Sequence, residues 1–189
     1  MAELALAPNP VVWQVVPGMD EAAAWYEQQI AAAPQAAREQ VAAAAGLALH
    51  ARFDTDLSQV LLLCDPAAEL YAMLGIAALD GVPAPDTAAG AVGIAESLVP
   101  SPWPAEALQF DLAGVRGWRV TILDDQNPDQ EEQVAVPQAV STVYVASVGG
   151  RCVVAALSSL TPLAAAVAQV LAEQVVATFD VVEGVDSGD

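Results

Sequence analysis

The apolar residues of this chain form short runs that are separated by turn residues. Residues 60–64 are continuously apolar and end at an Asp-Pro turn, as in a strand that is buried on both faces. Residues 11–16 form a shorter β-prone run. Residues 70–79 fit either a helix or a strand and are interpreted as a strand, and residues 92–99 are also predicted to form a strand.

The strongest local signal is a predicted hairpin. Residues 142–148 and 151–157 flank Gly149 and Gly150, and these glycines allow the positive φ angles of a two-residue turn. If Val148 faces Arg151, one face carries Tyr144, Ala146, Val153, Ala155 and Leu157, and the other carries Val143, Val145, Cys152, Val154 and Ala156. Both faces are apolar, so we expect other elements to cover the sheet on both sides. A second hairpin is predicted around the Ala-Gly pair at residues 113–114.

Two segments are predicted to be helical. An alanine-rich segment begins with Asp20 as its N-cap, is interrupted by Pro34 and stops at Gly46. Near the other end of the chain, Thr161 and Pro162 are typical of a helix start. An apolar stripe then follows at Leu163, Val167, Val170 and Leu171.

These elements predict an α+β protein. Its antiparallel sheet has about six or seven strands and is sandwiched by the N-terminal helical segment and the C-terminal helix. The chain has 189 residues, which fits one domain. We expect that domain to span residues 1–182 and to be followed by a flexible acidic tail at residues 183–189.

The charge balance restricts the partners that this protein can bind. The chain has 24 acidic residues, five arginines and no lysine, so its net charge is −19 and the excess comes from missing bases. Such a surface repels phosphate backbones and anionic membranes, and we therefore expect no nucleic-acid partner. A basic protein would be attracted, and a homodimer is an open alternative.

No membrane span and no export signal are predicted. Residues 152–172 carry no charge, but serines and Pro162 interrupt this stretch, so a strand, a turn and a helix explain it better. The first residues do not show the basic segment followed by an apolar segment that is typical of a secretory signal peptide. We expect a cytoplasmic protein with Cys64 and Cys152 as reduced, buried thiols.

The residue inventory argues against catalysis. Without lysine there is no Schiff-base chemistry, and a single histidine, His50, excludes a polyhistidine metal site. His50 is interpreted as a structural residue at a helix end, where the negative end of the helix dipole stabilises it. We therefore predict that the protein is not an enzyme and needs no cofactor.

One acidic loop has the spacing of a calcium site. Asp125, Asn127, Asp129 and Glu131 occupy positions 1, 3, 5 and 7 of a calcium-binding loop. Directly after Asp129, where such loops carry glycine, this chain has Gln130, and the glutamate that ends such loops is absent. A solvated acidic loop is therefore the preferred interpretation.

Four residues are candidates for contact with a partner. Arg116, Trp118 and Arg119 form the only basic cluster, which either grips an anionic or aromatic group or pairs with the chain's own acids. Trp103 lies between two prolines and is either a rigid docking residue or a plug over the sheet edge.

The last 45 or so residues contain several short motifs, which are Val143-Tyr144-Val145, Gly149-Gly150, Val153-Val154, residues 158–162 and Thr178-Phe179-Asp180-Val181. In these motifs the chain resembles the C-terminal part of the Mog1/PsbP-like superfamily, which includes LpqN-type lipoproteins and DcrB-like secretion chaperones. The N-terminal third has no counterpart. The resemblance implies a sheet-and-helix scaffold that binds other proteins without catalysis.

These observations favour a protein-binding adaptor or chaperone, with a link to a secretion pathway. The first alternative is an immunity or antitoxin-like protein that binds a basic toxin, whose complex should weaken as salt rises. The second is a small carboxylate-based enzyme or ligand-binding domain, which would need a deep cleft with converging carboxylates. A structural subunit of a larger assembly is the third.

Overall fold

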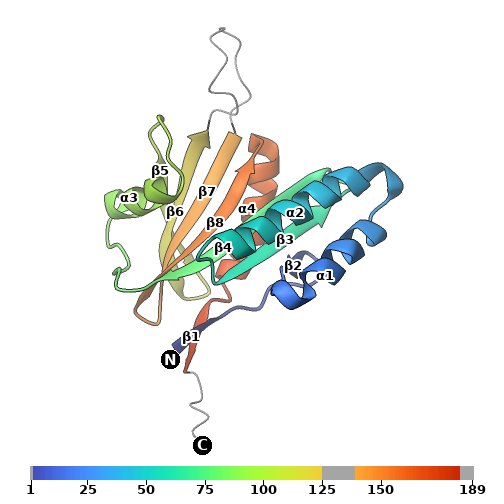
Figure 1. Cartoon of the computed structure of the whole chain (residues 1–189). Helices are drawn as coiled ribbons and strands as arrows, with labels where there is room; N and C mark the ends of the chain where they lie inside the picture. Colours follow the sequence, from blue (N-terminus) through green and yellow to red (C-terminus); the bar gives the residue numbers. More distant parts are fainter. Residues whose placement is uncertain (1, 125–138, 184–189) are drawn as a thin grey trace, which may run out of the picture.

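The computed structural model describes residues 2–124 and 139–183, which form the helices and strands drawn in Figure 1. The strands are β1 (Ala2–Ala5), β2 (Trp13–Val15), β3 (Gln59–Asp65), β4 (Leu70–Leu79), β5 (Glu106–Leu112), β6 (Val115–Asp124), β7 (Ala139–Val148), β8 (Arg151–Leu160) and β9 (Asp180–Glu183). The α-helices are α1 (Met19–Ala32), α2 (Arg38–Asp54), α3 (Ala88–Leu98) and α4 (Pro162–Val176), and a short 3₁₀ turn, η1 (Gln35–Ala37), precedes α2.

Seven of the strands form one antiparallel sheet in the order β2-β3-β4-β8-β7-β6-β5. β1 and β9 pair separately and bring the two ends of the described chain together (Figure 1). The predicted α+β class and the predicted size of the sheet are therefore confirmed. β4 and β8 lie at the centre of the sheet, where each has a strand on both sides.

The central hairpin, β7 and β8, has the predicted register and turn. Val148 pairs with Arg151, and Gly149 and Gly150 have φ angles of +56° and +78°. The two predicted faces are also confirmed, because they belong to two different hydrophobic clusters on opposite sides of the sheet. Both sides are covered, as the apolar alternation required.

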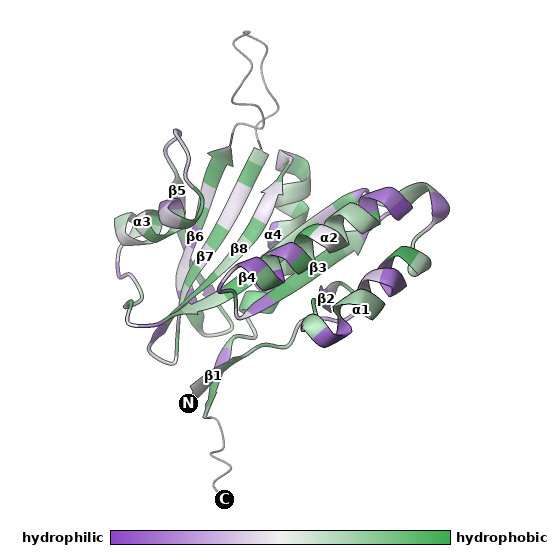
Figure 2. Ribbon diagram, in the orientation of Figure 1, coloured by the Kyte–Doolittle hydropathy of each residue, from purple (hydrophilic) through white to green (hydrophobic). Residues whose placement is uncertain are grey.

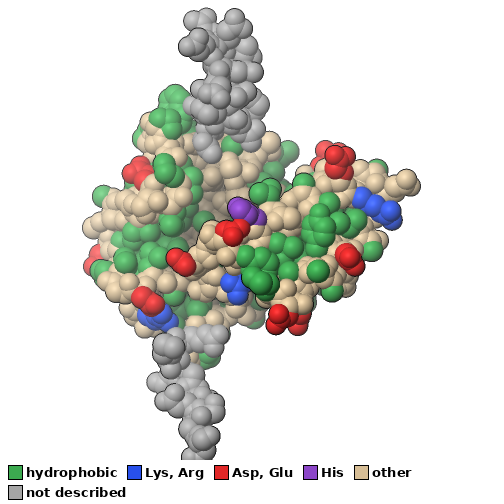
Figure 3. All heavy atoms as spheres, in the orientation of Figure 1, with side chains coloured by type: hydrophobic (Ala, Val, Ile, Leu, Met, Phe, Trp, Pro, Cys, Tyr) green, Lys and Arg blue, Asp and Glu red, His purple; other side chains and the backbone are tan. Residues whose placement is uncertain are grey.

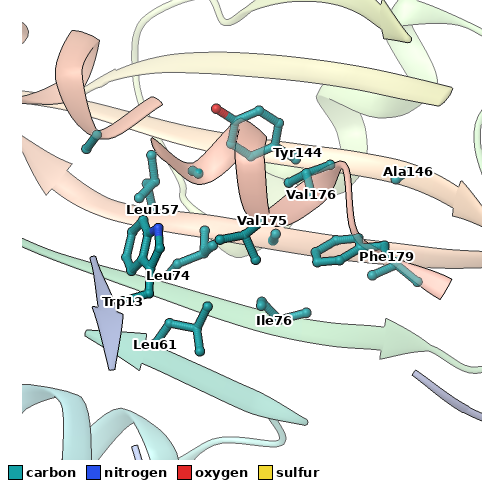
Figure 4. Packing of buried hydrophobic residues seen from close by; sticks show 14 of the residues in the cluster. Trp13, Leu61, Leu74, Ile76, Tyr144, Ala146, Leu157, Val175, Val176 and Phe179 are labelled. Carbon is teal, nitrogen blue, oxygen red and sulfur yellow. The ribbon is translucent and has the colours of Figure 1, made fainter. Parts of the chain in front are cut away.

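The α4 side of the sheet holds the larger core. Trp13, Tyr144 and Phe179 are buried there together with Val175 and Val176 of α4. Figure 4 shows these side chains pointing toward one another between α4 and the strands. The Trp13 indole N–H donates a hydrogen bond to the Leu171 carbonyl oxygen at 3.2 Å, so the short edge strand β2 is tied to α4.

The opposite side of the sheet is covered by two separate helices. α2 lies over β3 and β4 with Ala45 and Ala48 buried, and α3 lies over β5, β6 and β7 with Ala91 and Ala95 buried. Alanine is short, so both helices approach the strands closely. Figure 2 shows hydrophilic residues on the outer sides of α1 and α2 and mostly hydrophobic residues along β3 and β4.

The predicted strand at residues 92–99 is wrong, because this segment belongs to α3. Thr87 caps the helix by accepting a hydrogen bond from the Gly90 N–H at 3.2 Å. Ala91 and Ala95 are the buried positions, and their spacing of four is the helical period. The apolar residues between them had hidden this period by making the segment resemble a buried strand.

The predicted helix limits in the N-terminal third need two corrections. α1 begins at Met19 with Gly18 as its N-cap, so Asp20 lies in the first turn, where a carboxylate stabilises the positive end of the helix dipole. α2 continues through Gly46, where a Cβ would lie 3.9 Å from the Tyr26 ring. A side chain at this position would therefore make only ordinary contact with α1, and Gly46 does not end the helix. The break at Pro34 is confirmed.

Substitution of the two turn glycines should separate backbone strain from steric conflict. Both have positive φ, which costs an alanine about 1–2 kcal/mol. A Cβ on Gly149 would also lie 2.9 Å from Val181 Cβ, whereas a Cβ on Gly150 meets nothing within 4 Å. We expect Gly149→Ala to lower the free energy of unfolding by about 1 kcal/mol more than Gly150→Ala in urea denaturation. Equal losses would show that β9 does not pack on this turn.

Candidate functional site

Two hollows of about 420 and 480 Å³ lie along β4 and β8, the first beside α2 and the second beside the C-terminal end of α3. Their lining residues occupy neighbouring positions on the same face of β4 and β8, so the two hollows follow one another along these strands. Figure 3 shows this side of the molecule, where the surface is hollowed between the two helices. We call the pair of hollows the central groove.

Small side chains line the second hollow of the central groove. They are Gly75 and Ala77 of β4 and Ala156 of β8, together with Val154. At Gly75, a Cβ would lie 2.8 Å from Leu57 Cδ1, so the glycine lets Leu57 pack directly on the strand. The side chain of Leu57 therefore covers Gly75, and the surface there is apolar.

The walls of the central groove are apolar side chains that remain exposed. Leu47 of α2 is 65% exposed, and Leu98 at the end of α3 is 46% exposed. Val82, in the loop before α3, is 39% exposed. Leu47 lines the first hollow, and Leu98 and Val82 line the second. Exposed apolar side chains beside such hollows are typical of a binding surface.

Polar groups are confined to the ends of the central groove. At the end nearest Tyr71, the Met73 N–H donates a hydrogen bond to Ser158 Oγ at 3.1 Å. At the other end, Asp56 and Asp80 line the hollow. Asp80 accepts a hydrogen bond from Arg151, whereas Asp56 is exposed. The end nearest α3 is therefore acidic.

The predicted basic cluster is split between the two faces of the sheet. Arg116 and Trp118 line a different hollow, of about 360 Å³, beside residues 83–86. Arg116 Nε donates to Asp111 at 2.9 Å, and the Trp118 indole N–H donates to the Pro85 carbonyl oxygen at 3.1 Å. Arg119 points to the α4 side. The arginines pair with acids, which was the plainer of the two interpretations.

Arg119 forms an ion pair that ties the sheet to α4. Its Nη1 donates to Glu173 Oε1 at 2.8 Å, and both side chains are mostly buried. Beside this pair, the Tyr144 hydroxyl donates to the Gln169 carbonyl oxygen at 3.2 Å. Burial, and then the charge of Glu173, raises the pKa of Tyr144 well above its usual range, so this hydroxyl keeps its proton. These groups are structural parts of the core.

Trp103 is partly exposed and does not line the central groove. Its side chain is 44% exposed, and its backbone N–H donates to Ser101 Oγ at 3.1 Å. Ser101 in turn donates to the Leu123 carbonyl oxygen at 2.6 Å, which fixes the proline-rich segment beside β6.

The acidic calcium-type loop of Asp125, Asn127, Asp129 and Glu131 lies outside the described residues. Within the part of the chain that the structure describes, no three His, Cys, Asp or Glu side chains gather as a metal site would need. Among the same residues, no helix has both the length and the apolar character to cross a membrane.

His50 and the two cysteines are further side chains with reactive groups. His50 Nδ1 lies 2.5 Å from Asp54 Oδ2 in the last turn of α2, and both side chains are well exposed. The structural role predicted for His50 stays a prediction. Cys152 is buried and Cys64 is half-buried, and desolvation raises the pKa of both thiols, so neither is an activated nucleophile.

Sequence reasoning did not find the central groove. The small residues at alternate positions of β4 and Ala156 indicate part of its floor in the sequence. The walls could not be predicted, because the wall beside Leu98 depends on α3, which was interpreted as a strand. The groove exists only because two helices cover this face and leave its centre open.

Comparisons with known proteins do not assign a family. No family model matches the chain, and no curated protein matches it. A crystal structure from Bacteroides thetaiotaomicron VPI-5482 is similar to 69% of this chain, with 14% sequence identity and a TM-score of 0.40. The match covers 41% of that protein, so this chain spans less than half of its length.

Proposed function

We propose that this protein is a non-catalytic adaptor or chaperone that holds an apolar segment of another protein in the central groove. The observation that carries the proposal is a pair of exposed leucines, Leu47 in the first hollow and Leu98 in the second, beside two hollows that follow one another along β4 and β8. Apolar surface of this kind gains free energy when a partner covers it.

The occupant that fits best is a helix. On this face α2 lies over β3 and β4, and α3 lies over β5, β6 and β7, so β8 is the strand between the two helices. A partner helix would complete the layer of helices at the usual packing distance of about 10 Å. The apolar side chains of such a helix would point toward the hollow beside Ala77 and Ala156 at helical spacing.

The charges around the groove favour a helix with a basic end. Asp56 and Asp80 stand at the end nearest α3, and the whole chain carries a net charge of −19. An arginine or lysine at the corresponding end of the helix would find an opposite charge there. The net charge would also speed the approach of a basic partner.

The resemblance to the Mog1/PsbP-like superfamily supports the same type of function. Members of that group bind other proteins on a sheet-and-helix scaffold, and they include DcrB-like secretion chaperones. A role in the cytoplasm, beside a secretion pathway, is the biological setting that we propose.

Leu47→Glu tests the proposal, because it places a charge on the groove wall at a position that is already exposed. The matched control is Met19→Glu on α1, where the side chain is 74% exposed and lies outside the groove. Tagged wild type and both variants would be recovered from cells of the source organism, and the co-purifying proteins quantified. We expect one stoichiometric partner with wild type and Met19→Glu, and its loss with Leu47→Glu.

Salt then separates this function from the immunity-protein alternative. A complex held mainly by apolar burial should survive washing at high salt, whereas a complex held by charge should dissociate. A partner that both variants retain, or one that high salt removes, would contradict the proposal.

A further inference from the structure

The outer edge of β5 has no partner strand among the described residues. β5 pairs with β6 over its whole length, from Glu106 to Leu112, and β6 is its only neighbour in the order of the sheet. Among the same residues, no backbone hydrogen bond from a turn or loop reaches β5. Leu108 is 56% exposed and Gln109 is also exposed, so this strand is open to solvent.

The turn between β5 and β6 determines which backbone groups of β5 point outward. Both turn residues have positive φ, at +52° and +93°, as in the two-residue turn whose flanking residues are hydrogen-bonded to each other. Here the flanking residues are Leu112 and Val115. Because ladder hydrogen bonds alternate along a strand, the N–H and C=O groups of Ala107, Gln109 and Asp111 point away from β6. The outer edge therefore offers a donor and an acceptor at every second residue.

β5 lacks the devices that usually prevent a free edge from pairing with another chain. Such devices are a very short strand, a lysine, a proline or a bulge. The opposite edge of the sheet has one of them, because β2 is only three residues long. β5 has seven residues without lysine or proline, and its register with β6 has no bulge. Its charged residues, Glu106 and Asp111, lie near its ends and leave residues 107–110 uncharged.

We infer that an extended segment of a basic protein binds here by adding a strand to the sheet beside β5. The edge selects a strand, because an extended backbone repeats its donors and acceptors at the same spacing. The charge selects a basic segment, since Glu106, Asp111 and the neighbouring Asp86 outnumber Arg116. A second copy of this chain, with its own net charge of −19, would be repelled.

The hollow of about 360 Å³ beside β5 would receive a side chain of the added strand. Gln109, whose backbone groups point outward, lines this hollow together with Trp118 and Asp86. The Trp118 indole N–H donates to the Pro85 carbonyl oxygen at 3.1 Å, which holds the ring in place. The hollow thus offers an arginine or lysine an aromatic wall and a carboxylate. β5 does not line the central groove, so the two binding sites are separate.

Gln109→Pro tests the inference, because it removes one outward N–H and leaves the hydrogen bonds between β5 and β6 in place. Gln109→Thr is the matched control, since it changes the side chain and keeps the N–H. Short random peptides displayed on phage would be selected on wild type, and their affinities measured for all the proteins. We expect peptides in which arginine or lysine occurs among β-branched residues. Gln109→Pro should weaken them by about tenfold or more, the effect of one lost hydrogen bond, and Gln109→Thr should weaken them less.

Methylation of the peptide backbone tests the same contact without a protein variant. Each selected peptide would be made in two forms, with N-methyl groups on one or the other set of alternate residues. Only the set that faces β5 donates to it, so one form should lose binding to wild type and the other should keep it. Leu47→Glu should bind the unmodified peptides as wild type does, which separates this site from the central groove.

Three results would overturn the inference. They are a selection that enriches no peptide, peptides that bind Gln109→Pro as tightly as wild type, and equal binding of the two methylated forms. Loss of the peptides with Leu47→Glu would also overturn it, because it would place them in the central groove.

Discussion

Trp13→Ala should lower the free energy of unfolding by about 4 kcal/mol, the range expected when a fully buried tryptophan is removed. The side chain is 2% exposed and lies among Leu61, Leu74 and Leu157 in the core between the sheet and α4 (Figure 4). β2 is only three residues long and pairs with β3 alone, so Trp13 is the main attachment of this edge strand. Urea denaturation followed by circular dichroism would measure the loss.

Trp13→Phe is the matched control, because it keeps an aromatic ring and removes the donor to the Leu171 carbonyl oxygen. We expect a loss of about 1.5 kcal/mol, from one hydrogen bond and a small cavity. If Trp13→Ala costs no more than Trp13→Phe, the indole is not the anchor of β2 and the described packing of this edge is wrong.

Gly117→Ala should lower the free energy of unfolding by about 3 kcal/mol, the upper part of the range for overpacking in a core. A Cβ at this position of β6 would lie 2.2 Å from the Val145 carbonyl oxygen and 2.8 Å from Ala146 Cα. Both atoms belong to the backbone of β7, so no side-chain rotation relieves the contact. Phe110, which pairs with Gly117 across β5 and β6, lies 3.0 Å from the same Cβ position.

Gly93→Ala is the control for Gly117→Ala and should have the opposite sign. Gly93 is an exposed residue within α3, and a Cβ there meets nothing within 4 Å. Alanine in a helix is favoured over glycine by about 1 kcal/mol, so this variant should be more stable than wild type. A thermal midpoint of Gly117→Ala at or above the wild-type value would show that β6 and β7 are not as close as described.

The parts of the fold that local signals specify were predictable from the sequence. The hairpin of β7 and β8 was predictable, because Gly149 and Gly150 determine its turn. The alternation of side chains along each strand then determines which residues share a face. The start of α4 was also predictable, because Thr161 and Pro162 mark it directly. In both cases the residues that determine the structure are neighbours in the chain.

The parts that were missed depend on packing between distant segments. Residues 92–99 are apolar enough for a buried strand, and the helix is decided by the Thr87 cap and by the fit of Ala91 and Ala95 on the sheet. Gly46 resembles a helix stop, but α2 continues through it to Asp54, with Ala45 and Ala48 buried against the sheet.

The candidate sites follow the same rule. Arg116, Trp118 and Arg119 are adjacent in sequence, but alternation on β6 sends Arg119 to the opposite face, where it binds Glu173. The central groove combines residues from α2, β4, the end of α3 and β8, which lie far apart in the chain. No short motif encodes such a surface, and only the arrangement of the helices reveals it.

Photo-crosslinking from the groove wall tests the central claim most directly. A photoreactive phenylalanine analogue would replace Leu47 in one sample and Met19 in another, and adducts formed in cells of the source organism would be mapped by mass spectrometry. The account predicts that position 47 crosslinks to one partner, within a segment whose apolar residues recur every three or four positions, and that position 19 does not. Adducts at position 19 alone, or a segment at position 47 without that spacing, would contradict it.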